Sequence, residues 1–393
     1  SVVLGSATPS LEAYYRAGRG EYRLLQLTKR LTGGELPTVY TVDLRQELQE
    51  GNRSIFSRKL QELMTDRLNK GQQTILFLNR RGYAGFVSCR SCGEVMKCPH
   101  CDVSLSEHKG GRLICHYCGY TQPMPKLCPK CGSKYILGFK AGTQQIEEKL
   151  KELYPGVRTL RMDADTTRTK DSYEKILSSF ANGEADVLIG TQMIVKGHDF
   201  PKVTLVGILA ADLSLNASDY RAGERTFQLL TQAVGRAGRG VLPGEAVIQT
   251  YQPDHYAITC AAAQDYESFY QEEILYRELS GYPPVAHMLA VQIYGKEEEN
   301  VKQLALRLTD VVKSNMDFLS GKQKEQSNKK IQVLGPAPAN ISKINDIYRY
   351  VFYVKHAEYD VLVEVKDRLE ETLRQWQSRQ MSIQFDFDPV SVL

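Results

Sequence analysis

The sequence lacks the long apolar segments of a membrane protein. No apolar run approaches the roughly 18 to 20 residues that a membrane-spanning helix needs. The N-terminus has neither the charged region nor the cleavage site of a signal peptide. We therefore expect a cytoplasmic protein that does not enter a membrane. The chain opens on the apolar residues 1–4 without an initiating methionine, so we expect it to begin inside a larger protein.

A strong charge of either sign is also lacking, and so are the motifs that hold nucleotide phosphates. The formal net charge is only +4, which does not by itself indicate a polyanionic partner. A search for the phosphate-binding loop G-x-x-x-x-G-K-[ST] and for a D-E-x-H box finds neither. The chain is therefore not expected to hydrolyse ATP alone. Its 393 residues are enough for two or three domains.

Cysteine is present in an ordered pattern. Eight cysteines form four C-x-x-C pairs within one short segment, namely Cys89–Cys92, Cys98–Cys101, Cys115–Cys118 and Cys128–Cys131. Four thiolates in a tetrahedron bind a structural zinc ion, and a C-x-x-C turn supplies two of them. A disulfide framework is the alternative, but it needs an oxidising compartment. The pattern therefore predicts two structural zinc ions.

The pairing of these cysteines has two solutions. In the nested one, Cys89, Cys92, Cys128 and Cys131 form site 1 around site 2, which comprises Cys98, Cys101, Cys115 and Cys118. We favour it because the inner pairs flank a predicted hairpin over 102–114, while sequential pairing remains open. Eight thiolates fill two tetrahedra, so His100, His108 and His116 are predicted at the surface. Cys260 is predicted to be a small buried apolar residue.

Strand and helix patterns alternate on both sides of the cysteine segment. Apolar runs at 73–79, 157–163, 185–191 and 203–212 read as strands, and 143–156 and 172–180 read as helices. Thr143 is predicted to cap the first of these helices. Near-continuous Val, Ile and Leu strands between helices indicate a parallel sheet covered on both faces. We predict one α/β domain over 21–86 and 136–254, with a zinc module at 87–135 inserted into it.

The C-terminal part has a different texture. After a helical linker over 255–286, residues 287–393 read as β-α-β-β-α-β, the order of the ferredoxin-like motif. The fold class predicted for the whole chain is therefore α/β with an additional C-terminal α+β domain. Residues 1–20 are predicted to form a separate segment, because they contain one of the motifs described next.

Six stretches in order resemble parts of superfamily 2 helicases. GSATPS at 5–10 is similar to motif III, LFLNRRGYAGFVSC at 76–89 to motif IV, GTQMIVKGHDFPKV at 190–203 to motif V and QAVGRAGRG at 232–240 to motif VI, with AGTQQIEEKL and RMDADTT between IV and V. With eight cysteines between motifs IV and V, the chain resembles the bacterial primosomal replication restart helicases over essentially its whole length. The stretch 335–355 also matches, although Ile347 stands where that family usually has glycine.

The resemblance implies a fold and an ATP site shared between two lobes. Residues 21–86 and 136–254 become the second RecA-like lobe, residues 1–20 the remnant of the first, and the C-terminal domain ferredoxin/S10-like. The catalytic residues implied are Arg239 as the arginine finger, Arg236 and Gln232. The residues implied to line the ATP cleft are Lys196, Gly197, Asp199 and Gly235, with Asp199 meeting the ribose. Ser6 and Thr8 would couple the two lobes, and ATP with Mg²⁺ would bind only in the full-length protein.

DNA contacts are also implied by the resemblance. The candidates share backbone amides, hydroxyls or cationic groups that hold phosphates without reading sequence; they are Arg80, Arg81, Tyr83, Gly142, Thr143, Thr191 and Gln192. Lys109 and Arg112 at the tip of the predicted zinc-module hairpin are candidates for contacts with DNA or a partner.

The function implied is that of an ATP-dependent DNA helicase, moving 3′ to 5′, that remodels stalled forks and promotes primosome assembly. Implied partners are forked and single-stranded DNA, other primosome proteins, the single-stranded DNA-binding protein and the replicative helicase loader. A monomer associated with the bacterial nucleoid is expected. Two alternatives remain: a zinc-dependent scaffold without turnover, and an RNA-acting superfamily 2 helicase, since contacts to phosphates do not distinguish DNA from RNA.

Overall fold

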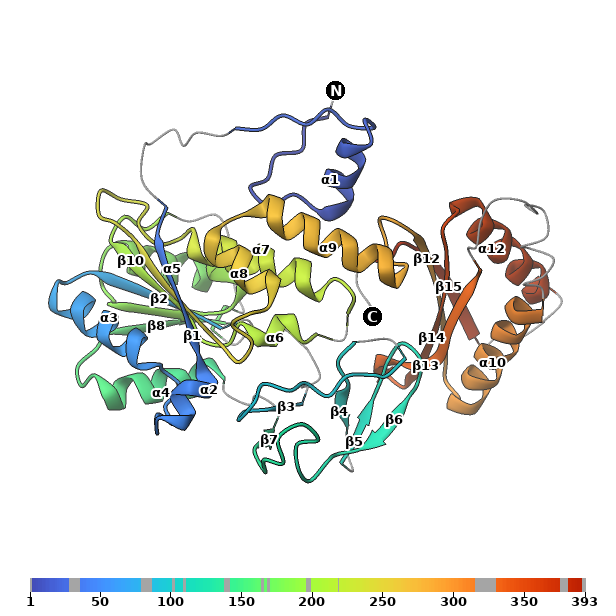
Figure 1. Ribbon diagram of the computed structural model, residues 1–393, viewed down its shortest axis with the longest axis horizontal. Helices are drawn as coiled ribbons and strands as arrows, with labels where there is room; N and C mark the ends of the chain where they lie inside the picture. Colours follow the sequence, from blue (N-terminus) through green and yellow to red (C-terminus); the bar gives the residue numbers. More distant parts are fainter. Residues whose placement is uncertain are drawn as a thin grey trace.

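The computed structural model describes residues 2–27, 36–78, 87–100, 103–108, 111–137, 142–163, 166–167, 170–195, 199–217, 219–314, 330–374 and 381–390. Figure 1 shows a large α/β unit at one end and a smaller sheet flanked by helices at the other, with the cysteine-rich segment and helix α9 (Tyr266–Ser280) between them. Within the described residues, no helix is both long enough and apolar enough to cross a bilayer.

A six-stranded parallel sheet forms the large unit. Its strands, in spatial order, are β1 (Thr38–Asp43), β11 (Glu245–Thr250), β10 (Val203–Ile208), β2 (Gln73–Phe77), β9 (Val187–Gly190) and β8 (Thr159–Met162). Every residue of β2, β9 and β10 is buried. The near-continuous apolar runs that predicted a sheet covered on both faces are thereby explained.

Helices cover both faces of this sheet. The apolar sides of α3 (Arg58–Asn69) and α4 (Thr143–Leu153) share one core with β2, β9 and β10. The other face packs against α5 (Lys170–Ala181), α7 (Ala222–Val234) and α8 (Tyr256–Ala263). The short elements α2 (Leu44–Gln49), η1 (Gln192–Val195) and α6 (Asp212–Leu215) complete the unit. The predicted α/β fold is confirmed.

The cysteine-rich segment forms two small sheets. One pairs β3 (Ser88–Cys89) with β7 (Ile136–Leu137), so the segment leaves and rejoins the large unit side by side. The other has three antiparallel strands, β4 (Ser106–His108), β5 (Arg112–Ile114) and β6 (Thr121–Pro123). The predicted hairpin corresponds to β4 and β5.

The C-terminal part is a four-stranded antiparallel sheet in the order β13-β14-β12-β15. Its elements follow one another as β12 (His287–Gly295), α10 (Glu298–Ser314), β13 (Gln332–Ile344), β14 (Ile347–His356), α12 (Tyr359–Arg374) and β15 (Met381–Phe387). This is the predicted β-α-β-β-α-β order. The two outer strands of the sheet are β13 and β15, as the two split β-α-β units of a ferredoxin-like fold require.

Both faces of the C-terminal sheet contribute to a core. Leu289, Val291 and Phe352 face α10 and α12. The alternate residues of β12 and β14, among them Met288 and Tyr353, belong to a core that they share with the cysteine-rich segment. Tyr117 stacks on Tyr353 with ring centroids 5.1 Å apart. The cysteine-rich segment is thus packed against this sheet.

An N-terminal helix, α1 (Leu11–Gly18), lies beside α9 (Tyr266–Ser280), as Figure 1 shows. The Tyr14 ring meets Tyr266 and Tyr270 of α9 edge-on at 5.0 and 4.6 Å. Helix α9 ends at Gly281, and the chain then enters β12. Helix α9 therefore contacts the N-terminal segment through its first turns and leads into the C-terminal sheet.

Three sequence predictions about single residues were wrong. Gly142, not Thr143, is the N-cap of α4, and the Thr143 hydroxyl instead donates to Asp163 at 2.6 Å. His116 is buried, because it lies under the C-terminal sheet, where its Nδ1 is 3.1 Å from the Pro338 carbonyl oxygen. Cys260 is only partly buried against the core.

Candidate metal centres and the nucleotide and DNA sites

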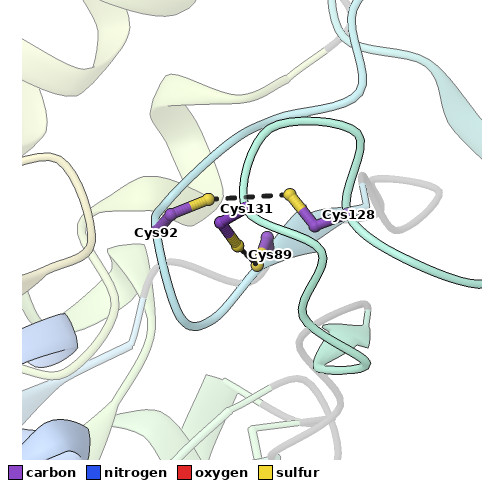
Figure 2. Close-up of side chains that lie close together, drawn as sticks. All are labelled: Cys89, Cys92, Cys128 and Cys131. Carbon is purple, nitrogen blue, oxygen red and sulfur yellow. Dashed lines mark hydrogen bonds between the residues drawn. The ribbon is translucent and has the colours of Figure 1, made fainter.

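The outer cysteine pairs come together in one cluster. Cys89, Cys92, Cys128 and Cys131 offer sulfur atoms that all lie within 4.8 Å of one another. The Sγ atoms of Cys89 and Cys131 are 3.6 Å apart, as are those of Cys92 and Cys128 (Figure 2). A tetrahedral zinc ion with Zn–S bonds of about 2.3 Å needs sulfur atoms about 3.8 Å apart, whereas a disulfide needs about 2.05 Å. The cluster therefore fits zinc.

The inner pairs form the second cluster. Cys98, Cys115 and Cys118 lie within the same limit, and the Sγ atoms of Cys98 and Cys118 are 3.5 Å apart. Cys101, the fourth predicted ligand, lies outside the described residues. The structure thus has the nested arrangement of the pairs, and the two clusters are consistent with two zinc sites.

One backbone turn recurs at all four pairs. The first cysteine of each pair donates its amide to the carbonyl oxygen five residues later, at 2.8 Å for Cys89, Cys98 and Cys115 and at 2.9 Å for Cys128. Burial raises the pKa of the Cys89 thiol, but amide donors at Cys92 and Ser91 outweigh it and lower this pKa to about 7. Cys98 has the same turn, yet burial raises the pKa of its thiol to about 12, so the thiolate there depends on the bound cation.

His108 and His116 lie beside the second cluster. Their Nε2 atoms are 3.0 Å apart. Burial lowers the pKa of both imidazoles, so both rings are neutral. One Nε2–H then donates to the Nε2 atom of the other ring. His116 also contacts the C-terminal sheet through the Pro338 carbonyl oxygen, and neither ring belongs to the cysteine clusters.

The arginines of the glycine-rich turn gather around one carboxylate. Arg239, just beyond α7, forms an ion pair with Asp199, and its Nε donates to the Gly235 carbonyl oxygen at 2.8 Å. Arg236 Nη1 lies 3.7 Å from the same Asp199 oxygen. Burial lowers the pKa of Arg236, and the neighbouring Arg239 adds to this. Two guanidiniums sharing one carboxylate leave a local excess of one positive charge.

Of the other residues predicted to line this cleft, the structure describes Gln232 and Gly235. Gln232 is exposed in the last turn of α7, near Gly235, which is the C-cap of that helix. Lys196 and Gly197 lie outside the described residues. This group lies near the amino end of β10, because the Gly238 amide donates to the Val203 carbonyl oxygen at 3.0 Å.

The candidate DNA-binding residues that are described lie at the opposite edge of the sheet. Thr191 and Gln192 directly follow β9, and Gly142 and Thr143 start α4, whose first turn is tied to the end of β8 through Asp163. The carboxyl ends of parallel strands lie at the same edge of a sheet, so these four residues lie at the carboxyl edge of this one. Arg80, Arg81 and Tyr83, which follow β2, and Lys109 lie outside the described residues, and Arg112 is exposed in β5.

Asp163 was missed by the sequence reasoning. Its carboxylate accepts from Thr143 at 2.6 Å and lies 3.1 Å from Arg161 Nε. A carboxylate directly after a buried strand was the available signal, because such residues lie at the carboxyl edge of a parallel sheet.

Ser6 is exposed and accepts from the Thr8 amide at 3.1 Å, and Thr8 is buried.

Three families match consecutive parts of the chain. Residues 98–123 match the family described as PriA DNA helicase Cys-rich region domain, and residues 127–241 match the helicase conserved C-terminal domain. Residues 278–390 match the family described as primosomal protein N C-terminal domain. These matches fall on the second cysteine cluster, on the part of the parallel sheet that contains β8, β9 and β10, and on the C-terminal sheet.

Two curated relatives are similar over the whole chain. The replication restart protein PriA of Bacillus subtilis is 45% identical over 394 residues, which are 100% of this chain and 48% of that protein. The replication restart protein PriA of a Synechocystis strain is 41% identical over 400 residues, 100% of this chain and 46% of that protein. The chain spans about half the length of these relatives.

Fold and motifs together define the class of protein. A parallel helicase-type sheet, two cysteine clusters and an added C-terminal sheet place the chain in the class of helicase C-terminal regions that carry a cysteine-rich insertion. Within this class the chain belongs to the PriA family of replication restart proteins.

Proposed function

We propose that this chain is the part of an ATP-driven, 3′ to 5′ DNA helicase that supplies the arginines to the ATP site, acting at stalled forks to restart replication. The observation that carries the proposal is the similarity over the whole chain to replication restart proteins, with the cysteine clusters inserted along the chain between strands β2 and β8 of the helicase sheet. The division into segments 1–20, 21–86 with 136–254, 87–135, 255–286 and 287–393 is part of this proposal.

Arg239 has the setting that an arginine finger needs. It is partly exposed, held by Asp199 and the Gly235 carbonyl oxygen, and accompanied by Arg236. Their shared excess of positive charge suits a phosphate entering from outside this chain. During ATP hydrolysis, negative charge develops on the γ-phosphate oxygens, and a guanidinium delivered across a cleft stabilises it. Mg²⁺ bound to the phosphates would neutralise part of the same charge.

DNA binding is proposed for the opposite edge. There the amides and hydroxyls of Gly142, Thr143, Thr191 and Gln192 surround strand ends. Hydroxyls and helix N-termini hold phosphates without reading bases. The separation of the two sites by the length of the sheet supports different tasks for them, one at the nucleotide and one along the strand.

The partners and location follow from the family alone. We propose primosome proteins, the single-stranded DNA-binding protein and the helicase loader as partners of the full-length protein, in the bacterial cytoplasm at the nucleoid. The relatives named above are bacterial replication restart proteins, which supports this proposal.

The test is Arg239→Ala in the full-length protein. We expect DNA-stimulated ATP hydrolysis to fall by roughly 10³ or more, as for other arginine fingers, with DNA affinity nearly unchanged. Arg158→Ala is the matched control, since it removes a surface arginine that pairs with Asp186 beside the same sheet. This chain alone should not hydrolyse ATP.

Two results would contradict the proposal. Clear DNA-stimulated turnover by the Arg239→Ala protein, or by this chain alone, would make Arg239 an ordinary surface residue. A full-length protein that binds forks but hydrolyses nothing would favour the zinc-dependent scaffold, and turnover stimulated by RNA but not by DNA would favour an RNA helicase.

A further inference from the structure

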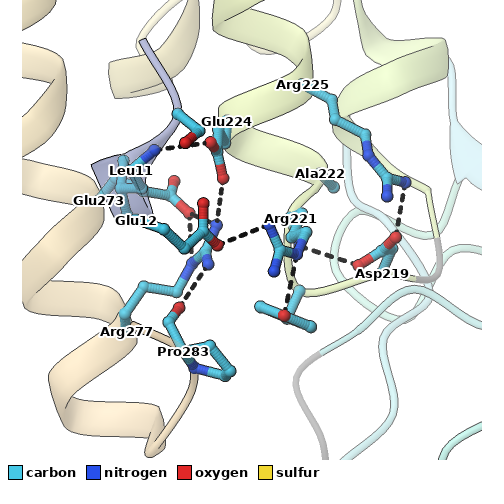
Figure 3. A network of polar contacts seen from close by, with 12 residues as sticks. Leu11, Glu12, Asp219, Arg221, Ala222, Glu224, Arg225, Glu273, Arg277 and Pro283 are labelled. Atoms are coloured by element: carbon cyan, nitrogen blue, oxygen red, sulfur yellow. Dashed lines mark hydrogen bonds and ion pairs between the residues drawn. The ribbon is translucent and has the colours of Figure 1, made fainter. Parts of the chain in front are cut away.

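A cluster of charged side chains, buried except for the partly exposed Glu12, lies where three parts of the molecule meet (Figure 3). We call it the junction cluster; it comprises Glu12 of α1, Arg221 and Glu224 at the start of α7, and Glu273 and Arg277 of α9. None of these residues belongs to the proposed nucleotide, DNA or zinc sites. The cluster therefore needs an explanation of its own.

Arg277 is the centre of the junction cluster. Its side chain is fully buried, and it pairs with Glu273 at 2.7 Å and with Glu224 at 3.1 Å. Its Nη1 donates to the Pro283 carbonyl oxygen at 2.7 Å, just before the C-terminal sheet begins. One guanidinium thus joins α7, α9 and the entrance to the C-terminal sheet.

The junction cluster also holds the N-terminal segment. The Leu11 amide donates to Glu224 Oε1 at 2.9 Å, and Arg221 Nη1 pairs with Glu12 at 2.6 Å. The Tyr266 hydroxyl donates to the Pro9 carbonyl oxygen at 3.0 Å. Pro9 belongs to GSATPS, the stretch at 5–10 that resembles motif III, and Leu11 and Glu12 directly follow it. That stretch is therefore tied to α7 by charged contacts that are largely shielded from water.

Helix α7 connects the junction cluster to the proposed ATP site. Glu224 lies in its first turn, and Gln232 lies in its last, followed by Gly235, Arg236 and Arg239. The helix is 13 residues long and packs on the sheet through Phe227 and Leu230. Because a packed helix moves as a rigid rod, a displacement at its start is carried to its end.

Packing alone does not account for the choice of residues. Apolar side chains of similar volume would stabilise a buried junction at least as well as five charged groups. The backbone also makes room for the charge, since a Cβ on Gly223 would lie 2.5 Å from Glu273 Oε2. What charged contacts add is a single defined geometry between the connected parts.

We propose that the junction cluster docks the GSATPS segment onto α7 and thereby sets the position of this segment relative to Arg236 and Arg239. This inference rests on the proposed function, because only a working ATP site gives that position a consequence. Glu12, Arg221, Glu224 and Arg277 are positioning residues that touch neither nucleotide nor DNA.

The docking is tested in this chain by hydrogen exchange. Glu12→Ala removes the partner of Arg221, and Glu224→Gln keeps the shape while weakening the acceptor of the Leu11 amide. Each should speed amide exchange in residues 11–18 by about tenfold, the effect of losing a hydrogen bond to a charged group. Glu21→Ala is the matched control, because its ion pairs lie on the surface within the same segment.

The consequence is tested in the full-length protein. Glu12→Ala and Glu224→Gln should lower kcat of DNA-stimulated ATP hydrolysis by about tenfold with KM for ATP unchanged. The reason is that these variants disturb the position of Arg236 and Arg239 relative to the GSATPS segment and leave the groups that bind ATP in place. A purely structural effect would instead lower the zinc content or unfolding temperature and change KM and kcat together.

The outcomes separate the two proposals. Unchanged exchange, or faster exchange with kcat equal to that of Glu21→Ala, would overturn the positioning role and leave the proposed function intact. A wild-type full-length protein without DNA-stimulated hydrolysis would refute the proposed function and with it the role in catalysis, whereas the exchange result would still decide whether the cluster docks the segment.

Discussion

Gly93 and Gly132 occupy equivalent positions at one cysteine cluster. Each glycine directly follows the second cysteine of its pair, and its amide donates to the carbonyl oxygen of the first cysteine. The distance is 2.8 Å for Gly93 and 2.9 Å for Gly132. Both adopt the left-handed region, with φ of +77° and +70°. They differ in surroundings, because a Cβ on Gly93 would lie 2.5 Å from the Tyr251 carbonyl oxygen, whereas one on Gly132 would meet nothing within 4 Å. The pair separates backbone strain from a steric clash.

Gly93→Ala is therefore expected to destabilise the protein more than Gly132→Ala. Both variants pay about 1 kcal/mol for a left-handed alanine, and Gly93→Ala adds a clash with main chain, for a total of about 2 to 4 kcal/mol. Thermal unfolding and zinc content of the two variants measure the difference. Equal losses in both would mean that Gly93 can move away from Tyr251 at no cost.

At the scale of elements, the zinc module is packed against the C-terminal sheet. Tyr117, two residues from Cys115, stacks on Tyr353 and accepts from the Tyr220 amide at 3.2 Å. Met288, Tyr353 and the cysteines belong to one core. A structural metal contributes its binding free energy to folding, so at this position it supports the sheet as well as the module.

Removal of zinc is expected to loosen β12 and β14 together with the cysteine segment. Elemental analysis should find two zinc ions for the two clusters, and a chelator or Cys115→Ser should unfold the segment, since structural zinc contributes about 10 kcal/mol or more. Hydrogen exchange should then rise in β12 and β14. Exchange in β2 and β10, which share no core with the cysteines, is the internal control. Absence of zinc with intact disulfides in mass spectrometry would refute the zinc assignment.

At the scale of the whole molecule, the two proposed sites lie at opposite edges of one sheet. The arginines are near the amino end of β10, and the candidate phosphate contacts are at the carboxyl ends of β8 and β9. The net charge of +4 gives little long-range attraction to DNA. Binding must then depend on local phosphate contacts.

We expect this chain to bind single-stranded or forked DNA weakly and with strong salt dependence. If about four phosphates are contacted, raising salt from about 50 to 200 mM should weaken binding on the order of a hundredfold. Fluorescence anisotropy with labelled forks at several salt concentrations measures the slope. An affinity that stays constant across this range would rule out a phosphate-tracking surface.

Much of this protein was determined by local sequence. Near-continuous apolar runs at 73–79 and 203–212 predict strands that are buried on both faces, and the 3.6-residue pattern at 143–156 predicts a helix with one buried side. Both patterns are encoded residue by residue. The C-x-x-C pairs likewise specify their own turns, because each turn closes within six residues. The fold class, four of the six strands of the parallel sheet and the two cysteine clusters were therefore predictable, whereas β1 and β11 were not predicted.

Tertiary structure alone decided what lies between those elements. His116 is buried because a sheet more than 200 residues further along covers it, and Thr143 turns to Asp163 because two strand ends meet at one edge. The junction cluster joins Leu11, Glu224 and Arg277, which only packing brings together. Contacts of this kind depend on the relative position of whole elements, and a linear pattern carries no signal for them beyond the i, i+4 spacing of Glu273 and Arg277.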